Sequence, residues 1–470
     1  MKQIKALLLL LATSASALAA DITLKPGQLQ GLLDKMTDES SLKISGTMDA
    51  RDIAALEKMP ASVTVLDLSD VKIASLTTSS RQYFGRTLFN EGEIPAYSFF
   101  KSGVETIILP KELSVIGDGA FAGSSITSIT IPEGVTSLGD YAFYGCISLE
   151  TAKLPKSVAA IGKGAFENCS SLSGIDLSST SVAAIPEKCF AGCQNLTELN
   201  IPGSTTFIGR EAFSHSGIKE LNLGNVEAFD SYALSGMQDL KYLTINPESK
   251  IGDGMLMDNT HLASVEGVPE RVPDYFAANC IELMTETLKN AFELGKYSFA
   301  NTKAPETLFL PAYITKIERG ALSGLSTITK IDVTALENNI PEVDATSFEG
   351  LSQQDIVLWV DDNSFEAWEA HPVWRLFQIM SNSQTGVDEM EADIDSSDIS
   401  IRCAGGLLIV ESPYNIIDLR VFTTDGRMAY VATPGQTRVE IETTGLPSGV
   451  AIVTASDEKG NTKTISLLLR

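Results

Sequence analysis

A short phrase returns at a nearly constant interval through the middle of this chain, and no other feature limits the possible folds as strongly. It reads IGDGAF at residues 116–121. Further copies are LGDYAF, IGKGAF, IPEKCF and IGREAF, which end at Phe143, Phe166, Phe190 and Phe213. From Phe121 onward the rings lie 22, 23, 24 and 23 residues apart. One unit of this size cannot bury its own apolar face, so consecutive units must stack.

A second phrase, of the form L-x-x-I-x-L-P, lies between copies of the first. Examples are LETAKLP at 149–155 and LTELNIP at 196–202. Its alternation places apolar residues on one face of a short strand, and the proline ends that strand because it has no N–H to donate. The first phrase supplies a glycine turn and an Ala-Phe pair that fills the space between layers. We predict an α/β repeat solenoid, right-handed, with a parallel sheet on one face and turns or short helical pieces on the other.

Together these phrases resemble the BspA-like leucine-rich repeats of Bacteroidetes type. The shared wording is I-G-x-x-A-F-x-x-C-x-x-L followed by L-x-x-I-x-L-P, and it extends over residues 94–380. From Phe229 onward the copies become weaker, so the register of the second half is less defined. The resemblance implies an exported or surface protein, chiefly bacterial, that adheres to host proteins or to other cells.

The segment before the repeats divides into two parts. Residues 1–19 carry two lysines, an apolar run and a small-x-small site that ends at Ala19, which is typical of a secretory signal cleaved after that residue. Residues 20–93 are expected to form an N-terminal cap, with a short helix at 31–35 and a strand at 63–68. The apolar run of the leader is too short to span a membrane, and no other long apolar run follows.

The C-terminal end of the array contains all three tryptophans, Trp359, Trp368 and Trp374. They fit a strand and an amphipathic helix that cover the last repeat, and this reading is favoured over an aromatic ligand platform.

The tail beyond the array has a different pattern. Residues 381–400 are polar and acidic, so we interpret them as a linker. Residues 401–470 alternate polar and apolar positions and predict a small all-β sandwich. The phrases at 421–427 and 446–453 resemble C-terminal sorting or anchoring domains of Bacteroidetes exported proteins. Ala451 replaces the tyrosine usual there and the lysine-rich end is missing, so a plain accessory sandwich also stays open.

Composition excludes several classes of function. The chain has 35 Lys and Arg against 60 Asp and Glu, a net charge of −25, which disfavours binding to nucleic acid. It has only 3 His, too few for a His-rich metal cage. We find no nucleotide-binding, metalloprotease or nucleophile-elbow motif. The prediction is therefore a protein without catalytic residues, metal or cofactor.

Three cysteines recur at one repeat position. Cys146, Cys169 and Cys193 each follow a repeat phenylalanine by three residues, so they should stack on neighbouring rungs about 4.8 Å apart. That spacing permits a disulfide. Three equivalent rungs cannot all pair, however, so a ladder of interior thiols is favoured.

The outward positions of the strands form columns along the predicted sheet. In the central columns acidic, amide and aromatic side chains gather, at Asp176, Glu198, Asn200, Glu220, Asn222 and Tyr242. We call these six residues the central face. It is a candidate recognition site for a basic protein segment or a glycan. A sheet surface that only contacts solvent is an equally good interpretation.

The sequence thus favours a non-enzymatic protein, secreted or on the outer cell surface, that mediates adhesion or protein recognition. Its expected partner is a host or bacterial surface protein, with a glycan as the alternative partner, and no membrane span is predicted in the mature chain. The alternatives are a glycan-binding component of a polysaccharide-uptake system, a carbohydrate-active enzyme, and a purely structural envelope component.

Overall fold

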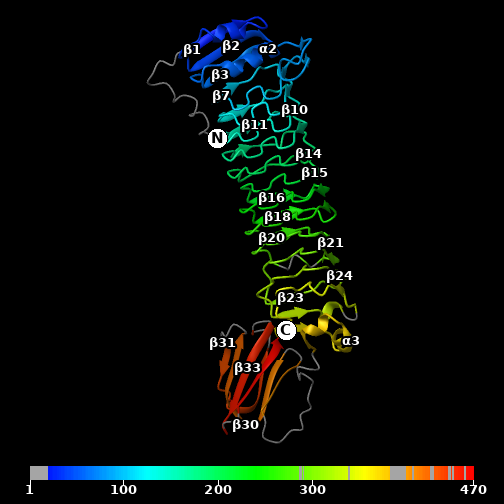
Figure 1. The fold of residues 1–470 in the computed structure, drawn as a ribbon. Coiled ribbons are helices and arrows are strands. Elements are labelled where there is room, and N and C mark those ends of the chain that lie inside the picture. Colours follow the sequence, from blue (N-terminus) through cyan, green and yellow to red (C-terminus); the bar gives the residue numbers. More distant parts are fainter. Residues whose placement is uncertain are drawn as a thin grey trace. The chain divides into compact units, whose positions relative to one another are not determined.

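The computed structural model describes residues 19–284, 288, 290–336, 339–381, 399–404, 407–423, 428–442, 446, 449–459 and 462–469. The chain divides into two compact units, Met1–Ser381 and Asn382–Arg470, and each has its own apolar core. The first unit is a stack of short strands that runs from blue to yellow in Figure 1. The predicted leader up to residue 18, and residues 382–398 of the predicted linker, lie outside the described residues.

The second phrase of each repeat supplies the parallel sheet that the sequence predicts. Its first block has the order β1-β2-β3-β7-β9-β11-β13. These strands are β1 Ala19–Leu24, β2 Ser41–Met48, β3 Val65–Ile73, β7 Thr106–Ile108, β9 Ser128–Thr130, β11 Thr151–Lys153 and β13 Gly174–Ile175. A second block contains β16 Glu220–Leu223, β18 Tyr242–Ile245 and β20 Ser264–Glu266. A third contains β23 Thr307–Phe309, β25 Lys330–Asp332, β27 Val357–Trp359 and β28 Gln378–Met380.

The first phrase also forms strands, where the sequence predicts only turns or short helical pieces. The first residue of each copy and the residue before it pair with neighbouring rungs as a second parallel ladder. Its members are β6 Glu93–Ile94, β8 Val115–Ile116, β10 Ser137–Leu138, β12 Ala160–Ile161, β14 Ala184–Ile185, β15 Phe207–Ile208, β17 Ala228–Phe229, β19 Lys250–Ile251, β21 Arg271–Val272, β22 Glu293–Leu294, β24 Lys316–Ile317 and β26 Glu342–Val343. Stacking places these backbone groups side by side, so they satisfy one another without a helix.

The repeat phenylalanines form a column of stacked rings inside the unit. Neighbouring centroids lie 5.0 to 5.7 Å apart and the ring planes differ by 3 to 11°. The column consists of Phe99, Phe121, Phe143, Phe166, Phe190 and Phe213, all buried. Alanine or cysteine precedes the last five of these rings and leaves room for them, which confirms the expected packing of the Ala-Phe pair.

Short helices occur mainly at the two ends of the stack, and α1 occupies much of the expected 31–35 helix. The helices are α1 Leu29–Leu33, α2 Ala50–Ala55, α3 Phe365–Ala370, and the 3₁₀ turns η1 Leu56–Lys58, η3 Thr334–Leu336, η4 Gln353–Asp355 and η5 Trp374–Leu376. A two-stranded hairpin of β4 Leu76–Thr77 and β5 Leu88–Phe89 also lies in the first cap.

Trp368 and Trp374 are fully buried at the other end, with ring centroids 5.4 Å apart. Their burial agrees with a cap over the last repeat and not with a ligand platform. Trp359 differs, because it is partly exposed on the sheet and Lys330 lies 4.3 Å from its ring centroid.

The second unit is an antiparallel β domain, as the alternating pattern predicts. Its strands are β29 Ser400–Ala404, β30 Leu407–Thr423, β31 Met428–Ala432, β32 Gln436–Glu442, β33 Gly449–Asp457 and β34 Thr462–Leu469. The long strand β30 pairs with β29 and β32 through its first half, and with β31 and β33 through its second half. Both halves contribute to one core, through Leu408 and Val410 and through Leu419 and Val421.

Candidate binding surface

Both parallel ladders of the first unit are interrupted at the same level, beside the central face. Strand β13 is the last of its block, and β12 and β14 belong to different sheets. Residues 197–201, where the pattern predicts a strand, have no strand structure. Two bonds cross the gap, Leu177 N–H to Asn200 O at 3.2 Å and Lys219 N–H to Thr197 O at 3.3 Å. The interval from Phe166 to Phe190 is one residue longer than those on either side of it.

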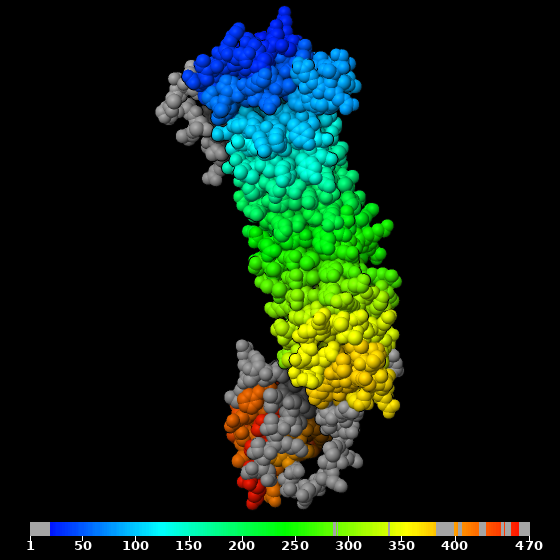
Figure 2. Space-filling view, in the orientation of Figure 1, coloured from blue at the N-terminus to red at the C-terminus, as the bar shows by residue number. Residues whose placement is uncertain are grey.

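The structure brings most of the central face together around this gap. The colour bar of Figure 2 places this part of the chain in the green middle of the repeat stack. Glu198 and Asn200 lie in the unpaired segment, and Glu220 and Asn222 lie on β16. Tyr242 on β18 is in register with Glu220 and is 54% exposed.

Asp176 follows β13 directly and lies at the border of the same region. Its carboxylate accepts the backbone N–H of Ser178 at 2.9 Å. That bond, the Ser178 hydroxyl and the Asn200 side chain hold the pKa of Asp176 below its ordinary value, so the carboxylate is charged at neutral pH. Asn222 likewise uses its side-chain oxygen locally, accepting the Gly224 N–H at 3.1 Å. Both side chains therefore shape turns as well as the surface.

Two shallow hollows lie at the gap. One has a volume of about 410 Å³ and includes Glu198, Asn200, Lys219 and Glu220 in its lining. The other measures about 810 Å³ and is lined by residues that include Asn200, Glu220, Asn222 and Tyr242. Five of the six predicted residues thus line one or both hollows, and Asp176 lines neither.

Sequence reasoning did not anticipate the apolar part of this surface. Leu199 and Ile201 occupy the inward positions of the predicted strand, yet both are only partly buried and line the larger hollow. The one signal for this exposure is the longer interval between Phe166 and Phe190. A further cavity that the sequence did not indicate lies at the N-terminal cap.

The cysteine ladder is interior and reduced. Each thiol donates to the carbonyl of a phenylalanine on the preceding rung, Cys146 to Phe121 at 3.0 Å and Cys169 to Phe143 at 3.1 Å. Cys193 makes the same bond to Phe166 at 3.1 Å. The five cysteines that the structure describes are free and buried. Burial raises the pKa of Cys193 to about 12, so these thiols are neutral and poorly nucleophilic.

Within the described ranges, no helix has the length and apolar character needed to cross a bilayer. The same residues contain no group of three or more His, Cys, Asp or Glu side chains placed to hold a metal ion.

A parallel solenoid with an exposed sheet and shallow hollows is the architecture of repeat proteins, which use such surfaces for extended contacts. The chain belongs to the BspA-type leucine-rich repeat family. The profile of the BspA type leucine-rich repeat region matches residues 92–183, 175–283 and 266–367, in 6 copies. No curated protein matches the chain.

One of three similar solved structures supports the fold by superposition. A leucine-rich repeat protein from Bacteroides ovatus is 21% identical, covers 79% of this chain and 93% of its own, and superposes with a TM-score of 0.55. A leucine-rich cell surface protein from Faecalibacterium prausnitzii is 20% identical over 47% of this chain and 82% of its own, with a TM-score of 0.25. The Treponema pallidum leucine-rich repeat protein is 23% identical over 36% of this chain and 71% of its own, with a TM-score of 0.26.

Proposed function

We propose that this chain is an exported recognition protein that binds a basic segment of a host or bacterial surface protein through its central face. Family membership supports a role in protein contact. The observation that carries the proposal is the gap in the sheet, where Glu198 and Glu220 flank the partly exposed Leu199 and Ile201.

This combination of side chains suits a protein partner. Partly exposed apolar side chains and a tyrosine supply area to bury, and carboxylates at the margin attract and orient a basic segment. The net charge of −25 strengthens that attraction over a longer range.

We propose further that the role is contact and not catalysis. The linings of both hollows contain neither histidine nor cysteine. Nucleophilic catalysis by a cysteine would need a thiol near a base, and the described thiols are buried and neutral.

The proposal also assigns a role to each end of the chain. Residues 1–19 direct export, and residues 401–470 sort or attach the protein at the outer surface. The resemblance of 421–427 and 446–453 to sorting domains supports this role, as does the separate core of the second unit.

The test is charge reversal at the gap. The variant Glu198→Lys/Glu220→Lys should bind about tenfold more weakly to whichever member of a panel of immobilised extracellular-matrix proteins and whole bacterial cells captures the unaltered chain. Surface plasmon resonance measures the affinity for the proteins, and cell pull-down measures binding to cells.

The matched control is Glu150→Lys/Glu266→Lys, which makes the same change of charge at exposed positions on the repeat strands or next to them. It should bind as the unaltered chain does. Equal binding by both double variants would refute the assignment of the central face.

A further inference from the structure

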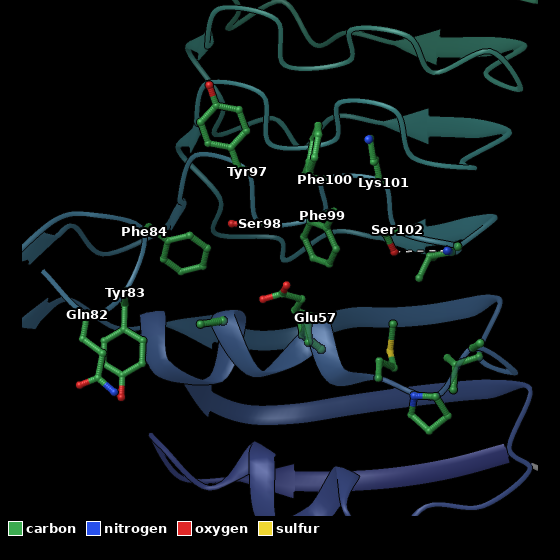
Figure 3. A pocket seen from close by; sticks show the side chains of 18 residues that line it. Glu57, Gln82, Tyr83, Phe84, Tyr97, Ser98, Phe99, Phe100, Lys101 and Ser102 are labelled. Atoms are coloured by element: carbon green, nitrogen blue, oxygen red, sulfur yellow. Dashed lines mark hydrogen bonds between the residues drawn. The ribbon is translucent and has the colours of Figure 1, made fainter.

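A cavity of about 610 Å³ lies between the N-terminal cap and the first repeat, several rungs from the central face. Glu57 in η1 lines it from the helical side, and Tyr83 and Phe84 line it from the loop between β4 and β5. Tyr97 and Phe100, in the turn after β6, complete it. Figure 3 shows the Glu57 carboxylate pointing from the helical side into the space near Phe84 and Phe99.

The loop between β4 and β5, which forms one wall of this cap cavity, is held in place by contacts on its side away from the cavity. Phe84 packs edge-on against the buried Phe89, with ring centroids 6.1 Å apart. Arg86 pairs with the buried Glu93, which also accepts the Asn90 side-chain amide at 2.8 Å. Burial would raise the pKa of Glu93, but the bonds from Arg86 and Asn90 outweigh it and lower the pKa. The loop is therefore held in place before any ligand arrives.

The repeat side presents two exposed rings. Tyr97 is 61% exposed and Phe100 is 50% exposed, and they meet edge-on with centroids 6.1 Å apart. The Lys101 ammonium lies 5.1 Å from the Phe100 ring centroid. Tyr141 and Tyr144 form the same edge-on pair in a later repeat, at 5.9 Å, but they do not line the cap cavity. An edge-on aromatic pair is thus a feature of the repeat itself. The N-terminal cap supplies the opposite wall of the cavity, which the later repeat lacks.

The chemistry of the lining selects among ligands. An apolar peptide side chain would remove water from the Glu57 carboxylate without replacing its hydrogen bonds, which costs free energy. An anionic ligand would meet Glu57 and a chain of net charge −25. A short oligosaccharide satisfies both halves of the lining, because the C–H face of one sugar ring packs on aromatic rings and the hydroxyls of a neighbouring ring bond a carboxylate.

We propose that the cap cavity binds a neutral oligosaccharide, with one pyranose ring packed against Phe100 and Tyr97 and the hydroxyls of a neighbouring ring bonded to Glu57. The volume lies within the range of about 300–1,000 Å³ typical of small-molecule sites. This site is independent of the central face and of the protein partner proposed for it.

The test uses the full mature chain and four neutral trisaccharides: maltotriose, cellotriose, laminaritriose and mannotriose. Saturation-transfer NMR should show contact of ring C–H protons with the protein for at least one of them, with a dissociation constant of about 1 mM or tighter by calorimetry. Phe100→Ser and Glu57→Gln should each weaken that binding by about tenfold.

Tyr144→Ser is the matched control, because it removes the equivalent ring of a later repeat, and it should leave the affinity unchanged. Glu198→Lys/Glu220→Lys should also leave it unchanged, so a failure of this site and of the central face can be distinguished. Thermal melting checks that each variant is folded. Absence of trisaccharide binding, equal binding by Phe100→Ser, or Phe100-dependent capture of apolar peptides in place of sugars would overturn the proposal.

Discussion

The position three residues after each repeat phenylalanine shows how one site in the repeat tolerates different chemistry. Cys146, Cys169 and Cys193 donate their thiol protons to carbonyls of the preceding rung. Asn259 occupies the same position and donates its amide to the Leu234 carbonyl at 2.9 Å. Ser124 occupies it in the repeat before Cys146. The side-chain donor is a second partner for that carbonyl, because Phe121 O also accepts the Ser124 backbone N–H at 3.0 Å. Leu325 and Leu351 occupy the same position, so a donor is accommodated there and not required.

The raised pKa of Cys193 predicts a loss of stability at alkaline pH. Burial raises this pKa from 9.0 to about 12. Between these values the unfolded chain releases the thiol proton and the folded chain keeps it, so stability falls as pH rises above about 9. Cys193→Ser, which keeps a small donor, should show a shallower fall of the melting temperature between about pH 8 and pH 11. Identical pH profiles for the variant and the unaltered chain would contradict the prediction.

At the scale of the element, each turn depends on the turn of the next rung. Tyr141 has a positive φ of 55° and its ring lies over Gly164, which has a φ of 58°. A Cβ at Gly164 would lie 2.5 Å from the Tyr141 ring. The same relation joins Tyr97 with Gly119, and Tyr232 with Gly254. A tyrosine in one turn therefore requires a glycine or a parallel ring in the next, and Tyr275 and Tyr297 stack in this way at 5.4 Å.

This dependence predicts a strong coupling between two substitutions. Gly164→Ala should destabilise the stack by the cost of a left-handed alanine, about 1–2 kcal/mol, plus the overlap with Tyr141. In the background Tyr141→Gly the overlap disappears, so the same change should cost less, with a coupling of about 0.5–3 kcal/mol. Urea unfolding followed by circular dichroism measures these differences.

The substitution Gly145→Ala separates the cost of a left-handed alanine from the cost of overlap with a neighbouring ring. Gly145 has a φ of 64° and no atom lies within 4 Å of its Cβ position. Its substitution should therefore cost only the backbone conformation. If Gly164→Ala lowers the free energy of unfolding by no more than Gly145→Ala does, the Tyr141 ring moves aside at little cost and the predicted overlap is refuted.

At the scale of the whole molecule, the chain contains two cores with no residue in common. One extends through the repeats and both caps, and the other belongs to residues 399–469. The repeat unit is closed at each end by its own helices, so it does not need the second unit to cover an apolar face.

Deletion of residues 382–470 should therefore leave the melting temperature of the repeat unit unchanged and abolish display at the cell surface. Calorimetry measures the first result, and labelling of intact cells measures the second. A chain in which a Gly-Ser segment of equal length replaces residues 382–398 keeps both units and should still be displayed. Undiminished display after the deletion would refute the sorting role proposed for residues 401–470.

The sequence alone was sufficient for the features that depend on periodicity. The regular return of Phe121 and its equivalents predicted the stack, the interior position of these rings and the buried Cys146 ladder, because every copy faces the same environment. Alternation in the second phrase placed Glu220 and Asn222 outward in the same way.

Only the tertiary structure decided where this regularity stops. The gap at 197–201 lies beside a repeat that is longer by one residue, yet Lys330 pairs with Val357 across a longer interval still, so repeat length alone does not place the gap. The second ladder exists because two-residue strands gain partners only after stacking. The cap cavity joins Glu57, Phe84 and Phe100 from three separate segments. Periodicity determines which side chains face inward, but cavities and gaps arise from the packing of segments that the sequence does not place next to one another.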